Sequence, residues 1–291
     1  MLLPLISVCI PTFNGAEFLK ETLDSISIQT YENLEVIISD DESEDKTLEI
    51  IEDFKKTSKI PVHIYKHIRS SIGANWNNCI KKANGEFIKF IFQDDLMEPA
   101  CISSLYRAYQ INKSAALVAC KREILIEDSI LNDETRKWKD EYGDLQKNLE
   151  LKEFNGLKIL NKKIFKSDFL FTKPLNKVGE PSVTLFPKKI IDKIGYFRED
   201  LKQNLDYEFY YRLLKRFDIV ILGQSLVKFR IHSEQATQLN KNNNIDDYRI
   251  FDKIIYKEYF WFLNRKKQIE YLKKYNLPFQ MLLKIRLSFI R

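Results

Sequence analysis

Short apolar runs typical of β-strands alternate with helical runs over the first 120 residues. A strand, a crossover helix and a second strand in this order form a parallel pair, because the helix returns the chain to the same end of the sheet. The sequence therefore predicts an α/β fold with a mainly parallel, Rossmann-like sheet covered by helices on both faces. The predicted strands are Leu5–Pro11, Leu34–Ser39, Val62–Lys66, Phe87–Phe92 and Ala116–Cys120. The predicted helices are Ala16–Gln29, Asp45–Lys56, Trp76–Ala83 and a run from Pro99, and Asn14 with Glu17 is typical of a capping box for the first helix.

The remainder of the chain is less regular. Residues 121–176 are polar and predict an insertion or mobile region over the sheet. Order returns at Val178–Phe186, with helices over Pro187–Ile194 and Asn204–Arg216, and strands over Asp218–Leu222 and Leu226–Ile231. Asn240–Asn244 predicts a linker, and an aromatic, basic and helical tail begins at Ile245. We expect one domain over residues 1–240, with halves 1–120 and 121–240, and a tail over residues 241–291.

Composition limits the class of protein. With 44% hydrophobic residues, 20 Phe and 14 Tyr, the chain can bury a substantial core and is not disordered. Its four cysteines are scattered without a CxxC spacing, which predicts buried thiols in a reducing compartment. No signal peptide or membrane-spanning run is evident, so a cytoplasmic location is expected.

The positive charge is unevenly distributed. The net charge is +6, but Lys253–Arg291 alone carries +8, which leaves −2 for the preceding residues. A slightly acidic body without a binding motif argues against a nucleic-acid partner. The basicity therefore belongs to the tail and not to the body of the domain.

Pairs of carboxylates follow two of the predicted strands. Asp40 and Asp41 end the second strand, and Asp94 and Asp95 follow the apolar run FIKFIFQ. A buried acidic pair is costly unless a cation or polar ligand compensates it, and ligands bind at the carboxyl ends of parallel strands in open sheets. No glycine-rich phosphate-binding loop follows a strand. A divalent cation with oxygen ligands, Mn²⁺ or Mg²⁺, would instead hold a diphosphate at this edge.

The order of these motifs resembles the family 2 glycosyltransferases, which have the GT-A fold. PLISVCIPTFNGAEFLKETLDSISIQTYENLEVIISDDESEDKT is similar to the opening of that family, and GANWNNCIKKANGEFIKFIFQDDLMEP continues through the region of its DXD motif. VGEPSVTLF, NLDYEFYYRLL and KFRIH follow in order, so the resemblance covers roughly residues 4–235. It implies a metal-dependent, inverting transfer of a sugar from a nucleotide-diphosphate donor to an acceptor hydroxyl.

The resemblance implies a donor site in the first half of the chain. The implied nucleotide-sugar-binding residues are Pro11, Thr12, Asp40, Asp41, Asn77, Gln93 and Asp94. Asp40, with Asp41, would contact the base or ribose, and the backbone of Pro11 and Thr12 would line the same subsite. The chain departs from the family at Phe92, which replaces the first Asp of the DXD motif, and at Trp76, where many relatives carry a phosphate-binding Arg.

The implied metal ligands are Asp94, Asp95 and His232. Asp94 matches the metal-binding carboxylate, and His232 matches a histidine that binds metal or diphosphate in some relatives. Asp95 is either a second ligand or a supporting partner. The plainer interpretations are that the strand-end acids, Asp40 and Asp41 included, cap helices and that His232 is a structural imidazole.

The second half is implied to bind the acceptor. Asp206 aligns with the general base, and its place in the first turn of a helix would keep it ionised through the helix dipole; the alternative is an ordinary helix-terminal acid. Glu180 is expected near the acceptor, and Gly179 before it predicts an unusual backbone geometry. Glu208 and Arg212 are spaced to form a helix-surface pair.

The expected partners follow from the same resemblance. The donor is expected to be a UDP-sugar, and the acceptor a glycan or lipid-linked glycan in bacterial surface polysaccharide synthesis.

In the tail, IIYKEYFWFL would pack on the domain or form a homodimer, whereas NRKK with Lys284, Arg286 and Arg291 suits an anionic membrane surface. Two alternatives remain open: a sugar-phosphate nucleotidyltransferase, although PTFNGAEF lacks its glycine-rich basic loop, and a non-catalytic scaffold.

Overall fold

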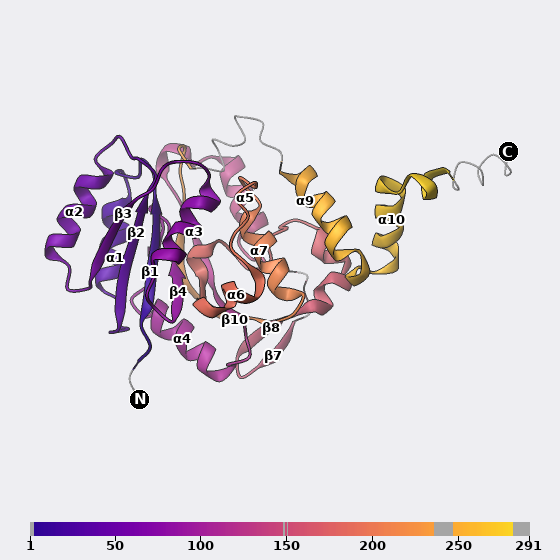
Figure 1. The fold of residues 1–291 in the computed structure, drawn as a ribbon, viewed down its shortest axis with the longest axis horizontal. Helices are drawn as coiled ribbons and strands as arrows, with labels where there is room; N and C mark the ends of the chain where they lie inside the picture. Colours follow the sequence, from indigo (N-terminus) through magenta and orange to yellow (C-terminus); the bar gives the residue numbers. More distant parts are fainter. Residues whose placement is uncertain (1–2, 148, 150, 236–246, 282–291) are drawn as a thin grey trace.

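A computed structural model describes residues 3–147, 149, 151–235 and 247–281 (Figure 1). Within them, ten strands form one sheet in the order β3-β2-β1-β4-β9-β6-β10-β8-β7, and β5 pairs with β10 off this path. The strands are β1 Ile6–Thr12, β2 Leu34–Asp40, β3 Val62–Lys66, β4 Phe87–Phe90, β5 Leu96–Met97, β6 Leu117–Ile126, β7 Lys152–Phe154, β8 Leu157–Leu160, β9 Thr184–Pro187 and β10 Ile219–Ile231. The predicted α/β class is confirmed.

The helices pack against this sheet through apolar stripes. In α1, for example, Leu19, Leu23 and Ile26 recur at the spacing of one helix face and are buried. Figure 1 shows the strands of the first half lying among these helices. The helices are α1 Leu19–Ser27, α2 Thr47–Thr57, α3 Ile72–Lys82, α4 Cys101–Ile111, α5 Asp133–Tyr142, α6 Ile191–Ile194, α7 Leu205–Leu214, α9 Tyr248–Ile254 and α10 Arg265–Tyr275.

The first four strands in the sheet order, β3, β2, β1 and β4, are all parallel. Every residue of β1 and β2 is buried, as expected for apolar strands covered on both faces. The register pairs Thr12 with Asp40, so the last residues of β1 and β2 lie side by side. The carboxyl edge of this parallel half is therefore where the predicted donor residues gather.

The predicted capping box at the first helix is wrong. The helix begins at Leu19, later than expected, and no side chain caps it. Asn14 instead adopts a positive φ of 45°, and its Oδ1 accepts a hydrogen bond from the Glu44 amide. Asn14 thus joins the loop after β1 to the loop after β2.

The second half is more regular than predicted. β6 continues to Ile126, and residues 133–160 form α5, β7 and β8, which extend the sheet. The two strands expected over residues 218–231 are one strand, β10, whose register against β6 shifts between Leu222 and Val227; a bulge of this kind lets a strand continue through an irregular stretch. Within Val178–Phe186, where order was expected to return, a 3₁₀ turn at Pro181–Val183 precedes β9.

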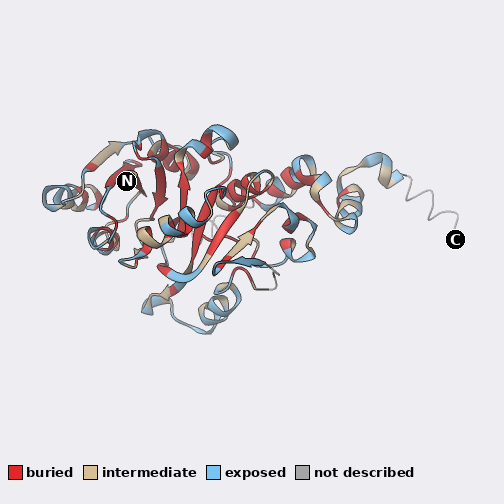
Figure 2. Cartoon of the chain, turned by 90° about the horizontal axis from the view of Figure 1, so that it is seen from below, coloured by how far each residue is buried: buried red, intermediate tan, exposed pale blue. Residues whose placement is uncertain are grey.

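Buried residues concentrate along the centre of the sheet (Figure 2). All four cysteines are free and buried, as predicted. Within the described ranges, no helix is long and apolar enough to cross a membrane.

The first part of the tail packs on the body. After α9 come a π-helical turn, Ile255–Tyr259, and a 3₁₀ turn, Phe260–Phe262. The Tyr259 ring is fully buried, with its centroid 5.3 Å from that of Phe165. By contrast, Trp261 is 86% exposed, and α10 lies at the far end of the molecule in Figure 1. The predicted linker Asn240–Asn244 and the basic residues Lys284, Arg286 and Arg291 lie outside the described residues.

Candidate active site

Asp40 fixes the turn that follows β2. Its Oδ2 accepts hydrogen bonds from Thr12 Oγ1 (2.7 Å) and Ser43 Oγ (2.6 Å), and its Oδ1 accepts one from the Ser43 amide. Asp40 is fully buried. It is not a helix cap, because α2 begins at Thr47 without a side-chain cap. Asp40 and Thr12 therefore shape the edge of the predicted nucleotide subsite together, next to the buried Pro11.

Asp41 lies at the same edge and is paired with a histidine. Its amide donates to the carbonyl of Thr12 at 2.9 Å, and its Oδ1 lies 2.5 Å from His67 Nδ1. Burial raises the pKa of Asp41, and the hydrogen bond with His67 partly opposes that rise. The pair thus places a half-buried imidazole beside the strand ends.

Gln93 joins the loop after β4 to the loop after β1. Its Oε1 accepts from the Phe13 amide at 2.9 Å, and its Nε2 donates to the Phe13 carbonyl at 3.0 Å. A Cβ on Gly15 would lie 2.4 Å from Gln93 Cδ, so this close approach requires glycine. The side chain of Gln93 is therefore engaged by backbone in this structure.

Asp94 and His232 meet at the end of β4. Asp94 Oδ2 lies 3.1 Å from His232 Nε2, and the Phe18 ring packs 4.7 Å from the imidazole. His232 Nδ1 is buried without a hydrogen-bond partner in the described part of the chain. A carboxylate oxygen and an imidazole nitrogen in contact fit one side of a Mn²⁺ shell. Among the residues described, no group of three or more His, Cys, Asp or Glu side chains could enclose a cation.

Asp95 points into the protein rather than toward this pair. It is fully buried, and its Oδ1 accepts from the Arg230 amide at 3.1 Å, while Oδ2 has no hydrogen-bond partner among the described residues. Burial, followed by the charge of Asp94, raises its pKa well above the usual range. Asp95 does not cap α4, which begins at Cys101 without a side-chain cap. Its position fits the supporting role rather than direct ligation.

Arg230 holds the backbone around Asp94. Its Nε donates to the Asp94 carbonyl at 2.9 Å, and its guanidinium also pairs with Glu21 and with Glu127. Arg230 is 4% exposed and lies in β10 two residues before His232. It thereby connects α1, the end of β6 and the loop that carries Asp94.

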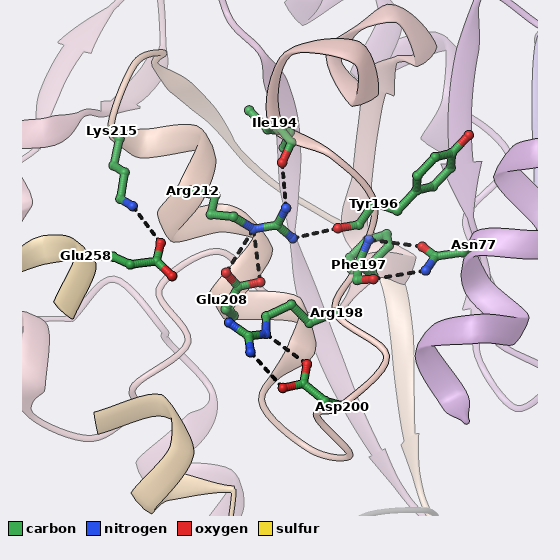
Figure 3. Close-up of polar contacts among 10 residues, drawn as sticks. All are labelled: Asn77, Ile194, Tyr196, Phe197, Arg198, Asp200, Glu208, Arg212, Lys215 and Glu258. Atoms are coloured by element: carbon green, nitrogen blue, oxygen red, sulfur yellow. Dashed lines mark hydrogen bonds and ion pairs between the residues drawn. The ribbon is translucent and has the colours of Figure 1, made fainter. Parts of the chain in front are cut away.

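Asn77 is engaged by the second half of the chain. Its Nδ2 donates to the Phe197 carbonyl (2.9 Å), and its Oδ1 accepts from the Phe197 amide (2.9 Å), as Figure 3 shows. The same Nδ2 also contacts Glu199. The Asn77 amide therefore clamps the 197 loop onto α3, and its part in nucleotide binding stays a prediction. Next to it, the Trp76 ring packs at a tilt against the Phe92 ring, with centroids 4.8 Å apart, so the two residues that depart from the family contact one another.

The second half of the site is attached to the first through Ser182. The buried Lys89 of β4 donates to the carbonyl of Ser182, and the Phe92 amide donates to Ser182 Oγ at 3.1 Å. Two residues earlier, Glu180 pairs with Arg122 Nε at 2.6 Å. Gly179 has a φ of 129°, as its sequence position predicted. Glu180 therefore lies close to the Asp94 loop, and its carboxylate is already neutralised by an arginine.

Asp206 is fixed by two donors at the start of α7. Its Oδ2 accepts from Asn176 Nδ2 at 2.7 Å, and its Oδ1 accepts from the Tyr207 amide at 2.7 Å. Asn176 Nδ2 also donates to the Gly179 carbonyl, and Asn176 Oδ1 accepts from the Gly179 amide. One amide side chain therefore aligns the carboxylate with the loop that carries Glu180.

The ionisation of Asp206 differs from the expectation. Burial raises the pKa of Asp206 to about 7, and the charge of Glu180 adds to the rise, while the hydrogen bonds from Tyr207 and Asn176 oppose it. The helix dipole was expected to keep the group ionised, but desolvation outweighs it. A carboxylate with a pKa near neutrality suits a general base better than a permanently charged one.

Glu208 and Arg212 form the predicted pair, at 2.8 Å between Arg212 Nε and Glu208 Oε1. Arg212 also donates to the carbonyls of Ile194 and Tyr196 (Figure 3). This pair is structural, because it ties α7 to the loop after α6.

Sequence reasoning missed Asn176, Arg122 and Arg230. Each acts through a contact with a residue far along the chain, and none belongs to a periodic run. The only available signals were the position of Arg230 in KFRIH and of Asn176 shortly before GEP.

The parallel strand ends, their acidic loops and the α7 carboxylate together define a GT-A glycosyltransferase. A sequence model of glycosyl transferase family 2 matches residues 7–195, more than half of the chain. The chain belongs to that family and is a glycosyltransferase, which replaces the nucleotidyltransferase alternative.

Relatives and solved structures agree with this assignment. An uncharacterized glycosyltransferase of Rickettsia typhi is 27% identical over 250 residues, which cover 84% of this chain and 69% of the relative. A GalNAc(5)-diNAcBac-PP-undecaprenol beta-1,3-glucosyltransferase of Campylobacter jejuni is 33% identical over 104 residues, or 35% of this chain and 34% of that protein.

Two structures share the fold. S. aureus TarS 1-349 in complex with UDP-GlcNAc has a TM-score of 0.60 at 19% identity, over 79% of this chain and 60% of that one. The mannosyltransferase PcManGT from Pyrobaculum calidifontis, in complex with GDP-Man and Mn²⁺, has a TM-score of 0.57 at 15% identity, over 98% of this chain and 80% of that one.

Proposed function

We propose that this glycosyltransferase moves a sugar, with inversion, from a nucleotide-diphosphate donor to a hydroxyl of a glycan or lipid-linked glycan. The observation that carries the proposal is the geometry of Asp206, a carboxylate held by two donors, with a pKa of about 7, beside the loop of Glu180. Such a group can take the proton of an acceptor hydroxyl as that oxygen attacks the sugar carbon. Glu180, positioned by Arg122, contacts the acceptor.

The donor is assigned to the edge formed by Thr12, Asp40 and Gln93. Asp94 and His232 hold a divalent cation, Mn²⁺ or Mg²⁺, which supplies positive charge for the departing diphosphate when bound. Asp95 and Arg230 support the Asp94 loop from inside the protein. The proposal draws support from the structural neighbours solved with UDP-GlcNAc and with GDP-Man and Mn²⁺. We assign UDP-sugars as the first class to test.

Release of the nucleoside diphosphate from a panel of nucleotide-sugars, with and without Mn²⁺, tests the reaction. Asp94→Ala should lower the metal-stimulated rate by about 100-fold or more, since metal stabilisation of a leaving group is worth several kcal/mol. Asp206→Asn should lower the transfer rate by about 100- to 10,000-fold, the usual contribution of a general base. Asp53→Ala and Asp200→Asn, at exposed ion pairs, are the matched controls. No turnover of any donor, or unchanged rates in both site variants, would contradict the proposal.

The tail is assigned to an anionic membrane surface, which would place the enzyme beside a lipid-linked acceptor on the inner face of the cell membrane. Trp261 is 86% exposed, and Lys266 and Lys273 of α10 have no ion-pair partner among the described residues. An exposed indole with neighbouring cations is the combination that anchors a surface helix to anionic lipid. The Campylobacter relative that is named for an undecaprenol-linked substrate supports such an acceptor.

Co-sedimentation with vesicles tests the tail. The bound fraction should be several-fold higher on phosphatidylglycerol vesicles than on phosphatidylcholine, and Trp261→Ala or Lys266→Glu with Lys273→Glu should remove the difference. Ile28→Ala, at another exposed apolar position, is the control. If Trp261→Ala alters the sedimentation mass instead of vesicle binding, the tail is a homodimer contact and the membrane assignment fails.

A further inference from the structure

A cavity lies at the edge of the sheet opposite to the donor site. Its volume is about 600 Å³, within the roughly 300–1,000 Å³ typical of small-molecule sites. It is lined by Pro4, by Glu86 and Phe87 where β4 begins, and by Pro187 at the end of β9 with four of the five residues that follow it, Lys188, Lys189, Ile191 and Asp192. Figure 1 shows α4, which supplies part of the wall, near the N-terminal end of the chain.

The topology separates this cavity from the active site. Phe87 pairs with Ile6 at the first residue of β1 and with Pro187 at the end of the antiparallel β9. The donor residues follow the other ends of β1 and β4. Seven residues of β1 at about 3.3 Å each place the two edges about 20 Å apart. A ligand in this cavity would therefore not occupy the donor subsite.

Aromatic rings form much of the cavity wall. Tyr106 and Tyr109 of α4 stand edge-on to Phe87, with centroids 5.5 Å and 4.8 Å away. Tyr196 comes from a separate segment of the chain, also lines the cavity, and is 39% exposed. Its backbone is fixed by Arg212, and Figure 3 shows its ring pointing away from that arginine. Three tyrosines from two separate segments thus line one cavity.

Charged groups of both signs stand around these rings. Lys188 donates to the Ala83 carbonyl, whereas the carboxylates of Glu86 and Asp192 and the ammonium groups of Lys113 and Lys189 are exposed at the cavity wall. Within the described ranges, none of these four exposed side chains makes a hydrogen bond or ion pair with the protein, so they are accessible to a ligand. The hydroxyls of the three lining tyrosines are likewise without an intramolecular hydrogen-bond partner in those ranges. A site that offers both signs of charge and several hydroxyls suits a ligand rich in neutral donors and acceptors. The two carboxylates would repel a polyanion, and the lysines would repel a polycation.

We propose that this cavity is a second binding site, for an uncharged oligosaccharide. The C–H face of a sugar ring packs on an aromatic ring, and its hydroxyls can both donate to carboxylates and accept from ammonium groups, so one ligand class satisfies both features of the wall. The inference rests on the proposed function in one respect, that the acceptor is a glycan, since the cavity would then hold a distant part of the same acceptor chain.

Isothermal titration of the full chain carrying Asp206→Asn tests the site without turnover. The probes are cellohexaose, maltohexaose and chitohexaose, with a sulfated hexasaccharide as the charged comparison. At least one neutral probe should bind at a 1:1 ratio, unaffected by saturating UDP. Tyr196→Ala and Lys189→Glu, both at exposed positions, should each weaken that binding by about tenfold or more, whereas Tyr248→Ala, outside the cavity, should not.

The outcomes separate the two proposals. Absence of binding by all three neutral probes, stronger binding of the sulfated probe, displacement by UDP, or unchanged affinity in both cavity variants overturns the second site. With no acceptor present, the same cavity variants, built without Asp206→Asn, should hydrolyse the donor at the wild-type rate, because the donor site lies at the other edge of the sheet. Failure of donor turnover in the wild type would contradict the proposed function while leaving the binding result valid.

Discussion

At the scale of single residues, the chemistry of the site depends on a few side chains that connect others. Asn176 is the clearest case, because one amide group contacts both the carboxylate of Asp206 and the backbone of Gly179. The carboxylate is partly exposed but strongly desolvated, so its charged form depends on the donors that it retains. Loss of the Asn176 hydrogen bond should therefore change the ionisation of Asp206 as well as its orientation.

This gives a prediction for the pH profile. Asp206 must be ionised to accept a proton, so the transfer rate should rise with pH through about 7, the pKa of that group, and fall about tenfold per pH unit below it. In Asn176→Ala the ionised form loses a hydrogen bond, so the rising limb of kcat against pH should shift to higher pH. Asn161→Ala, which removes a cap of a distant 3₁₀ turn, should leave the limb in place. An equal loss of rate at every pH would assign Asn176 a structural role alone.

The contribution of Asp206 to the free energy of unfolding should change with pH in the opposite direction to the transfer rate. The folded-state pKa of Asp206 lies above its unfolded value, so the folded protein binds more protons between about pH 4 and 7. The contribution of Asp206 to the free energy of unfolding should therefore fall as pH rises through this window. Comparison of the denaturant midpoints of wild type and Asp206→Asn across that window checks the sign, since the asparagine variant should lack this decline.

At the scale of elements, two loops are locked together by one close contact. Gly15 and Gln93 come from the loops after β1 and β4, and the Gln93 amide makes two hydrogen bonds to Phe13. In Gly15→Ala the new Cβ would displace that amide. The expected cost is about 1–3 kcal/mol, the value of two hydrogen bonds, with weaker donor binding. Gly223→Ala, where a Cβ meets nothing within 4 Å, is the control, and chemical denaturation is the measurement.

A double-mutant cycle sharpens this test. If the cost of Gly15→Ala arises from the displaced amide, it should largely vanish in a Gln93→Ala background. An undiminished cost there would show that the alanine strains the backbone itself.

The sequence predicted elements best where one local pattern decided the outcome. Val62–Lys66 is a strand with the predicted bounds, because an apolar run between turn residues has few alternatives. α3 begins a turn early because the Ser71 hydroxyl accepts from the Ala74 amide, a cap that apolar periodicity does not reveal. β10 was divided in two because the exposed residues at its bulge interrupt the apolar pattern.

Local sequence patterns likewise predicted only part of the candidate active site. Asp40, Asp94 and Asp206 could be chosen from their places after strands and at a helix start. The contacts of Asn77 with Phe197, and of Arg230 with Asp94, join residues more than 100 positions apart. Such pairings depend on how the halves pack, which no local pattern encodes.

At the scale of the whole molecule, the tail is part of the fold. Ile254, Ile255 and Tyr259 are buried, and the Tyr259 ring lies against Phe165 of the catalytic body. The sequence left open whether IIYKEYFWFL packs on the domain or forms a dimer, and the structure places its buried residues against the body. The exposed side of the tail, with Trp261, remains available to another surface.

Substitutions at Tyr259 test whether this packing stabilises the molecule. Tyr259→Ala should lower the free energy of unfolding by about 3–5 kcal/mol, as for other large buried aromatics. The hydroxyl of Tyr259 is buried without a hydrogen-bond partner in the part of the chain that the structure describes, and the ring also contacts the Lys215 ammonium at 4.0 Å. Tyr259→Phe keeps the ring and removes an unsatisfied polar group, so it should be neutral or slightly stabilising. Urea denaturation measures both variants, and a Tyr259→Ala protein as stable as wild type would mean that the tail does not pack on the body in solution.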